Sequence, residues 1–391
     1  MPKPRLGHED STWVNIAQAL RSKAQLAAGI MLSPIKPVVE GDDALDMPTA
    51  LALDYVREQQ NPSILPGISD RPDAEASRRT LIAVDSACDI AQSWLDYHHI
   101  VVMPRRIRAI DEELLETREP TALARQLEQL LPIAAKTVHS LPSSPVLLRD
   151  TIQRHLRRST TGVIVLTASA RQSAVYRNAV KAMQSLILIH AKVRRSLDPS
   201  APALRAWVID AQNALTGCGV LLAEAVRLRE RNLPVTAIIK SLKEFRTQVH
   251  TLALPGRFDF LARAAQSVEM QPIPLWKQHV AQMFSLVPML HMQADRLQVI
   301  KRLRRGPSGQ GAVLSRCLRA LERGILTTPL IAVSYAGPLD ALEALPEFAE
   351  LRRQCTREQI TLSVSPMSMT GALMLGPGAL SVSFASRTFR A

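Results

Sequence analysis

The chain has 391 residues, of which 47% are hydrophobic and 21% charged, and this is typical of a globular protein with two or three domains. A formal net charge of +13 suggests nucleic acid or anionic lipid as partners, but aromatic residues make up only 4%, which disfavours recognition of bases by stacking. The basic clusters, such as PRRIR at 104–108, are short and scattered and fit no zinc-finger, RNP or helix-turn-helix pattern. A solvated basic surface is therefore favoured, and nucleic acid is an unlikely partner.

The four cysteines lie far apart without C-x-x-C spacing, which predicts reduced core thiols. The first residues, MPKPRLGHEDST, have no apolar region behind their basic positions, and no uninterrupted apolar run reaches the roughly 18 residues of a membrane span. We expect a cytoplasmic protein.

The N-terminal part has apolar residues at helical spacing in 12–31 and 47–60, followed by a stretch rich in Pro, Gly and Asp at 61–79. This predicts an N-terminal helical extension and linker over residues 1–79. Two amphipathic helices need a surface to cover their apolar faces, so they favour packing on the body of the protein or on a second copy as a homodimer.

From residue 80 onward, short β-rich runs alternate with longer helical stretches. The runs lie at 80–84, 99–103, 136–140, 162–168 and 206–210. Alternating β and α units predict a parallel sheet flanked by helices, which we assign to a domain over residues 80–249.

Beyond residue 250 the alternation loosens. Strands are expected at 288–292, 296–303, 330–335, 360–364 and 380–385. They predict a second α/β domain with a mixed sheet over residues 250–391, so the fold class is α/β with two domains.

Small polar residues follow several of the predicted strands. Ligands of open α/β sheets bind beyond the carboxyl ends of the strands. The candidates are Asp85, Ser86, Ser140, Thr167, Ser169, Ser173 and Asp210. Such residues can hold a polar or anionic head group beside helix N-termini, or they can simply cap the helices that follow.

Known catalytic signatures are missing from the sequence. It contains no G-x-S-x-G, G-x-x-x-x-G-K-[ST] or H-E-x-x-H motif and no G-x-G-x-x-G after the first strand. Asp85 and Asp89 lie four residues apart, but further oxygen ligands at regular spacing are lacking. We predict no enzymatic activity, no metal site and no cofactor.

Five segments, in order along the chain, resemble segments of the DegV family, which includes the fatty-acid-binding subunits of fatty acid kinase. They are VDSACDI (84–90), HSLPSSP (139–145), ARQSAVYRNA (170–179), VIDAQNALTGCG (208–219) and LGPGALSVSFA (375–385). The resemblance covers about three quarters of the chain. It leaves out residues 1–79, so the chain resembles a divergent member with an N-terminal extension.

The resemblance implies an acyl chain in an apolar tunnel between two α/β domains, with its carboxylate held by hydroxyls and an imidazole. Ser173 matches a family serine that binds the carboxylate, and His139 stands at a family threonine. Gly376 and Gly378 match the closing loop near the head group, whereas Met374 replaces the histidine before that loop. His139 is then the candidate to replace the missing imidazole.

The family's G-G-R turn also loses its arginine, because Gln266 stands at that position. The changes at Met374 and Gln266 speak against docking to a kinase subunit that phosphorylates the bound acid.

Three functions follow from these observations. The leading hypothesis is a non-enzymatic carrier of a fatty acid or related acyl ligand. The alternative is a degenerate regulatory or interaction module that binds protein or nucleic acid through its basic surface and N-terminal helices. The third is a hydrolase or transferase that uses Ser173 and His139 as a pair, which requires their side chains within about 3.2 Å or one bridging water.

Overall fold

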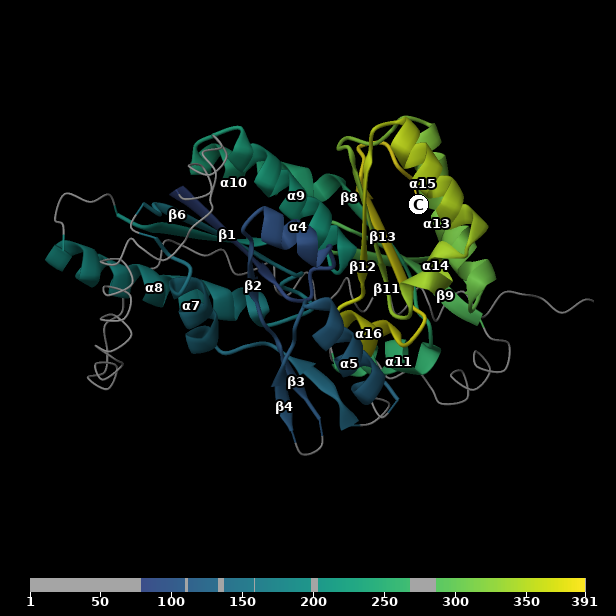
Figure 1. The fold of residues 1–391 in the computed structure, drawn as a ribbon, viewed down its shortest axis with the longest axis horizontal. Coiled ribbons are helices and arrows are strands. Elements are labelled where there is room, and N and C mark those ends of the chain that lie inside the picture. Colours follow the sequence, from purple (N-terminus) through teal and green to yellow (C-terminus); the bar gives the residue numbers. More distant parts are fainter. Residues whose placement is uncertain are drawn as a thin grey trace, which may run out of the picture.

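The computed structural model describes residues 79–109, 112–132, 137–157, 159–197, 203–267 and 286–390. All but the last residue of the predicted extension and linker, residues 1–79, lies outside the described residues. Two main sheets lie beside each other, each with its own helices (Figure 1). The α/β fold with one parallel and one mixed sheet is confirmed.

The first sheet has four parallel strands in the order β2-β1-β6-β7. Its strands are β1 (Thr80–Asp85), β2 (Val101–Met103), β6 (Gly162–Thr167) and β7 (Arg205–Asp210). Every residue of β1 and β6 is buried, as expected for strands covered on both faces.

Helices cover both faces of this sheet (Figure 1). They are α4 (Gln92–Tyr97), α9 (Thr216–Glu230) and α10 (Val235–Phe245) on one face, and α7 (Pro145–Gln153) and α8 (Val175–Leu197) on the other. A 3-10 turn, η2 (Arg246–Gln248), follows α10. This arrangement confirms the predicted parallel sheet flanked by helices.

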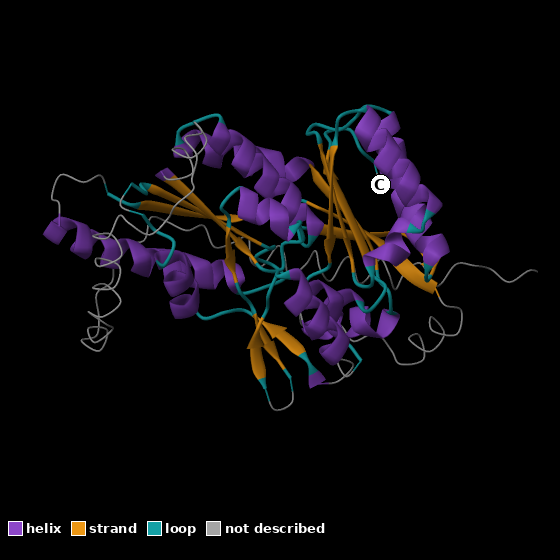
Figure 2. Cartoon of the chain, viewed as in Figure 1, coloured by secondary structure: helices purple, strands orange, loops and turns teal. Residues whose placement is uncertain are grey.

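A small antiparallel sheet stands apart from the two large ones (Figure 2). It consists of β3 (Arg106–Arg108), β4 (Glu113–Leu115) and β5 (His139–Leu141), and α5 (Pro120–Leu130) lies between β4 and β5 in the chain. The prediction of 136–140 as a strand of the parallel sheet was therefore wrong. Three-residue strands are too short for periodicity to reveal their sheet.

The second large sheet has six strands in the order β10-β9-β8-β13-β11-β12. They are β8 (Val249–Leu254), β9 (Leu286–Gln293), β10 (Arg296–Arg304), β11 (Leu330–Tyr335), β12 (Thr361–Pro366) and β13 (Leu380–Ala385). Only β11 and β12 pair in parallel, so the sheet is mixed. The sequence analysis missed β8, which begins one residue before the predicted start of the second domain at residue 250.

The remaining helices belong to the C-terminal part of the chain. They are α11 (Phe258–Ser267), α13 (Pro307–Glu322), α14 (Leu339–Glu343), α15 (Pro346–Arg357) and α16 (Met369–Leu375). α13, α14 and α15 lie on the outer face of the second sheet (Figure 1). Among the helices that the structure describes, none is both long and apolar enough to cross a membrane.

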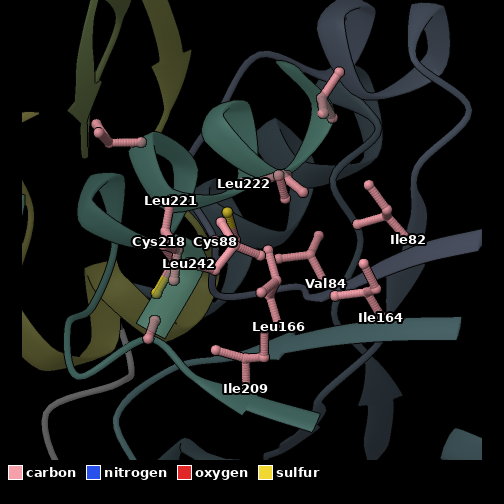
Figure 3. Packing of buried hydrophobic residues seen from close by; sticks show 14 of the residues in the cluster. Ile82, Val84, Cys88, Ile164, Leu166, Ile209, Cys218, Leu221, Leu222 and Leu242 are labelled. Atoms are coloured by element: carbon pink, nitrogen blue, oxygen red, sulfur yellow. The ribbon is translucent and has the colours of Figure 1, made fainter. Parts of the chain in front are cut away.

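Helix α9 lies between the two large sheets and contacts strands of both. It is buried nearly all round, as a helix in the middle of a protein must be. Its Cys218, Leu221 and Leu222 pack with strand residues such as Val84 and Leu166 (Figure 3). This contact joins the two sheets into one body.

The two glycines at the start of α9 make close packing possible. A Cβ at Gly217 would lie 2.3 Å from Asn213 Oδ1 and 2.4 Å from Thr251 Oγ1, and one at Gly219 would lie 3.0 Å from Asp89 O. Contacts below 3.0 Å require a neighbour to move. The G-x-G of the sequence therefore serves the packing of α9.

Two buried histidines face each other on neighbouring strands of the second sheet. His250 Nε2 lies 3.0 Å from the carbonyl oxygen of Ser386, and His250 Nδ1 lies 3.0 Å from His291 Nε2. Because a carbonyl only accepts, His250 carries its hydrogen on Nε2, and its Nδ1 accepts from His291. Burial lowers the pKa of both rings, and that of His291 to about 4.

This pair predicts a loss of stability in mild acid. The pKa of His291 in the folded protein lies below the unfolded value of about 6.5. Its contribution to the free energy of unfolding is therefore complete above pH 6.5 and is lost as the pH falls toward about 4. For His291, which stays neutral in the folded protein across this window, the loss approaches about 1.4 kcal/mol per pH unit. Urea unfolding at pH 7, 6 and 5 measures it, with His291→Gln as the matched variant. Equal losses in wild type and variant would contradict the assignment.

Candidate functional site

Arg105 lies at the carboxyl end of the first sheet, two residues after β2, and joins three segments of the chain. Its Nε donates to the Asp85 carboxylate at 3.0 Å, its Nη1 to Ser140 Oγ at 3.3 Å, and its Nη2 to Ser173 Oγ at 2.5 Å. Both partners of the ion pair are buried, with 8% of the Arg105 side chain and 1% of that of Asp85 exposed. A buried guanidinium thus gathers residues that the sequence placed at three different strand ends.

A second branch of hydrogen bonds leads from Ser140 to Glu116. Ser140 Oγ lies 2.7 Å from Thr370 Oγ1, which donates to Glu116 at 3.0 Å. Since Ser140 accepts from Arg105 and Thr370 donates onward, the hydroxyl hydrogen of Ser140 points to Thr370. Glu116 also accepts from Thr370 N at 2.6 Å and from Ser86 Oγ at 2.5 Å.

We call this set of hydrogen-bonded residues the polar centre. It comprises Asp85, Ser86, Arg105, Glu116, Ser140, Ser173 and Thr370. Burial raises the pKa of Glu116, although the bonds from Ser86 and Thr370 act in the opposite direction. Ser140 and Ser173 are only half-buried, so they form the side of the centre that solvent or a ligand reaches.

Ser173 lies just before α8, where a helix N-terminus favours negative charge. Its Oγ accepts from Val175 N at 3.3 Å as well as from Arg105. The hydrogen bonds of the described residues use Ser173 Oγ as an acceptor, which leaves its hydrogen for an added oxygen.

A second buried ion pair, between Arg118 and Asp89, links the two large sheets. Arg118 Nη1 donates to Asp89 at 3.3 Å, and Asp89 also accepts from Ser334 Oγ at 2.7 Å and Ser368 N at 2.9 Å. Ser334 belongs to β11, and Ser368 caps α16. Burial raises the pKa of Asp89 against the effect of Arg118.

An apolar cluster adjoins the polar centre and draws on both halves of the molecule. Ile107, paired with Ser140 across β3 and β5, belongs to it, as do Ala372 and Leu373 on the helix that carries Thr370. Further buried members are Leu123, Leu130, Leu131, Val138, Leu215, Ala253, Phe260, Leu290, Ala336, Met367, Met369, Leu375 and Ala379. Polar and apolar groups thus meet along β3, β5 and α16.

Three of the predicted site residues, His139, Ser173 and Met374, differ in their surroundings. The side chain of His139 is exposed, because neighbours along a strand point to opposite faces and Ser140 takes the inward position. Ser173 Oγ accepts from Arg105 and from Val175 N, and no hydrogen bond of the described residues joins Ser173 to His139 as the proposed catalytic pair requires. Met374 is half-buried against the apolar cluster, one helical turn after Thr370.

The Gly-Pro-Gly turn is bound to its own half of the molecule. Gly376 and Gly378 have φ of +85° and +80°, which glycine adopts without strain. Gly256 N donates to Leu375 O at 2.8 Å, and Gly378 N donates to Ala336 O at 2.8 Å. These bonds fix the end of α16, the helix that brings Thr370 to the polar centre.

Other residues at the strand ends bond to neighbouring loops rather than to the polar centre. Ser169 Oγ donates to Asp295 at 2.5 Å, and Asp210 accepts from Ala170 N at 3.1 Å and Gln212 N at 2.9 Å. Within the described part of the chain, no group of three or more His, Cys, Asp or Glu residues is arranged to hold a metal ion.

Sequence reasoning missed Arg105, Glu116 and Thr370. Arg105 belongs to the basic segment PRRIR, which was interpreted as solvated surface. A usable signal was present, since Pro104 and Arg105 follow β2 at the same edge of the sheet as Asp85 and Ser86. Glu116 and Thr370 carry no comparable signal in the sequence.

Comparison with known proteins identifies relatives over the same region. The model of the DegV family, described as "Uncharacterised protein, DegV family COG1307", matches residues 79–387. A DegV domain-containing protein of Xanthomonas campestris pv. campestris is 28% identical over 306 residues, which span 78% of this chain and 96% of that protein.

Solved structures share the fold. A DegV lipid binding protein from Thermotoga maritima has a TM-score of 0.61 at 17% identity, covering 80% of this chain and 100% of that one. The Fatty Acid Kinase (Fak) B3 protein from Streptococcus pneumoniae, solved loaded with linoleic acid, has a TM-score of 0.58 at 14% identity, covering 79% and 99%. Since the family model matches nearly the whole described part of the chain, the protein belongs to the DegV family.

Proposed function

We propose that the protein binds a fatty acid or a related acyl ligand. Its head group lies at Ser140 and Ser173, and its chain lies along the apolar cluster between the sheets. The observation that carries the proposal is the junction on α16, where Thr370 belongs to the polar centre and Ala372 and Leu373 to the apolar cluster. Relatives whose structures contain fatty acids support lipid binding over the regulatory alternative.

The energetics of such a site follow from burial of the alkyl chain. Each buried methylene contributes about 0.8 kcal/mol, so about ten of them supply about 8 kcal/mol, and the affinity is what remains after the entropy cost of immobilising the ligand. The polar centre then sets the orientation of the chain, as a few placed polar groups do in other apolar sites.

Holding rather than transforming the ligand is part of the proposal. A serine nucleophile needs a base that takes its proton, and the neighbour of Ser173 Oγ is a guanidinium, which cannot accept one. Met374 and Gln266 replace the histidine and arginine that the family resemblance implied. The proposal therefore covers binding of the acyl ligand and not its phosphorylation.

Removal of the Ser173 hydroxyl tests where the head group lies. Ser173→Ala is expected to weaken binding of oleic acid roughly 5- to 20-fold, because one hydrogen bond to a charged head group is lost. Titration calorimetry on the full chain measures the dissociation constant. Ser315→Ala on α13 is the control and should bind within about 2-fold of wild type. Unchanged affinity in Ser173→Ala would contradict this placement.

A further inference from the structure

We propose that Asp295 is a positioning residue that fastens the β9–β10 hairpin to the loops of the first sheet, and so sets how fast an acyl ligand enters and leaves the apolar cluster. This inference rests on the proposed function. It concerns the kinetics of ligand exchange, and none of the residues that it uses belongs to the polar centre.

The tip of the hairpin contacts two loops at the carboxyl edge of the first sheet. Ser169 Oγ, in the loop after β6, donates to Asp295 Oδ1 at 2.5 Å, and Asp295 N donates to the carbonyl oxygen of Gln212, in the loop after β7, at 2.9 Å. Arg171 Nε lies 3.8 Å from Asp295 Oδ2, but its side chain is 42% exposed, so this pair contributes little. Ser169 is fully buried and the Asp295 side chain is 5% exposed, so water replaces their bond poorly.

The backbone at the tip adopts a conformation that alanine does not favour by itself. Ala294 has φ of +47° and Asp295 of +62°, and Gln293 pairs with Arg296 across them, which is the two-residue loop of a type I′ hairpin. Alanine is disfavoured in this left-handed region, and such conformations persist where surrounding contacts hold them. The two hydrogen bonds from the tip to the first sheet's loops are contacts of this kind.

The same hairpin covers part of the apolar cluster. Leu290 on β9 is a buried member of the cluster, and Leu297 and Val299 on β10 pack against it. β10 is the edge strand of its sheet, and in the described part of the chain β9 pairs with β8 from Leu290 to Met292 alone. Because this pairing is short, the contacts of the tip are important for keeping the hairpin over the cluster.

The position of this bond predicts a kinetic effect. An acyl chain that lies along buried residues leaves only when part of the protein moves, and lifting the hairpin breaks the bond between Ser169 and Asp295 with or without a ligand. Loss of the bond should therefore raise the association and dissociation rates alike and leave the dissociation constant nearly unchanged. A residue that binds the ligand directly changes the dissociation constant instead.

Replacing Asp295 with glycine removes the carboxylate and keeps the turn, because glycine adopts φ of +62° without strain. The fluorescent fatty acid cis-parinaric acid, bound to the full chain, is chased with excess oleic acid. We expect Asp295→Gly to release it roughly 10- to 100-fold faster than wild type, with a dissociation constant within about 3-fold. Release at the wild-type rate, or a dissociation constant that rises in proportion to the release rate, would overturn the proposal.

Two further variants separate the bond from the turn. Ala294→Gly adds the same backbone freedom at the neighbouring position and keeps the carboxylate, so release should stay within about 2-fold of wild type. Ser169→Ala removes the other half of the bond, and adding it to Asp295→Gly should change the release rate little further. Release from Ala294→Gly as fast as from Asp295→Gly, or additive effects of Ser169→Ala and Asp295→Gly, would contradict the assignment.

Hydrogen exchange of the ligand-free chain separates this proposal from the proposed function. The amides of β9 and β10 should exchange roughly 10-fold faster in Asp295→Gly than in wild type, and those of α15 equally in both. If hairpin exchange is unchanged, the role of Asp295 is wrong and acyl binding stands. If the hairpin exchanges faster but no acyl compound binds wild type, the proposed function fails, and the role of Asp295 in ligand exchange fails with it.

Discussion

Replacing Arg118 with methionine is expected to lower the free energy of unfolding by about 3–5 kcal/mol, because it leaves the buried carboxylate of Asp89 without its cation. Arg118 is 3% exposed and Asp89 fully buried, so water cannot replace the lost partner. Arg118 also donates to Ile90 O and Pro366 O, which connect the first sheet to the end of β12. Urea unfolding followed by circular dichroism measures the loss.

The loss in Arg118→Met should depend on pH. Burial already raises the pKa of Asp89, and removal of Arg118 raises it further. A carboxyl whose pKa is raised in the folded protein adds stability at low pH that is lost as the pH rises. The variant should therefore lose more stability at pH 8 than at pH 5.5.

Adding Asp89→Asn to Arg118→Met should recover most of the lost free energy of unfolding. Arg352→Met, at an exposed pair with Glu343, should cost less than about 1 kcal/mol. A loss in Arg118→Met as small as in Arg352→Met would contradict the account.

Gly256→Ala is expected to cost about 3 kcal/mol or more, because the new methyl group meets backbone. A Cβ there would lie 1.9 Å from Pro377 O and 2.7 Å from Ala379 N. Backbone cannot rotate away as a side chain can, so the Gly-Pro-Gly turn would have to shift. Thermal and urea unfolding of the variant measure the effect.

Gly378→Ala in the same turn is the matched control. Its φ of +80° disfavours alanine, but a Cβ there meets nothing within 4 Å. The expected cost is about 1–2 kcal/mol from backbone strain alone. If Gly256→Ala were no worse than Gly378→Ala, close packing of the turn on the loop after β8 would be refuted.

The sheets could be predicted because their strands carry continuous apolar runs. β1, β6, β11 and β13 are buried along their whole length, and the predicted runs coincide with them. β8 is equally buried but contains His250 and Thr251, whose hydrogen-bond partners lie on distant segments. In the sequence alone, a buried polar residue whose hydrogen-bond partners lie far away along the chain cannot be told apart from an exposed polar residue.

The candidate site could be predicted in part for a topological reason. Parallel strands of one sheet end at the same edge, so Asp85, Ser86 and Ser173 had to lie near one another. The prediction for His139 depended on strand alternation, where a shift of one position exchanges the inward and outward faces. Ser140 takes the inward position, and His139 is exposed.

Arg105 was not predicted as a site residue, because charged residues in a sequence are assigned to the protein surface by default. Lys and Arg are rarely buried unless paired, and the partner that buries Arg105 lies twenty residues earlier in the chain. The pairing became visible only once β1 and β2 lay side by side.

Native mass spectrometry of the full chain purified from cells tests the central claim most directly, namely that this protein holds an acyl ligand. The account predicts one bound molecule per chain, released on denaturation and identified as a fatty acid or related acyl compound by lipid extraction. Preparations that are always free of ligand, and that take up no oleic acid when it is added, would contradict it.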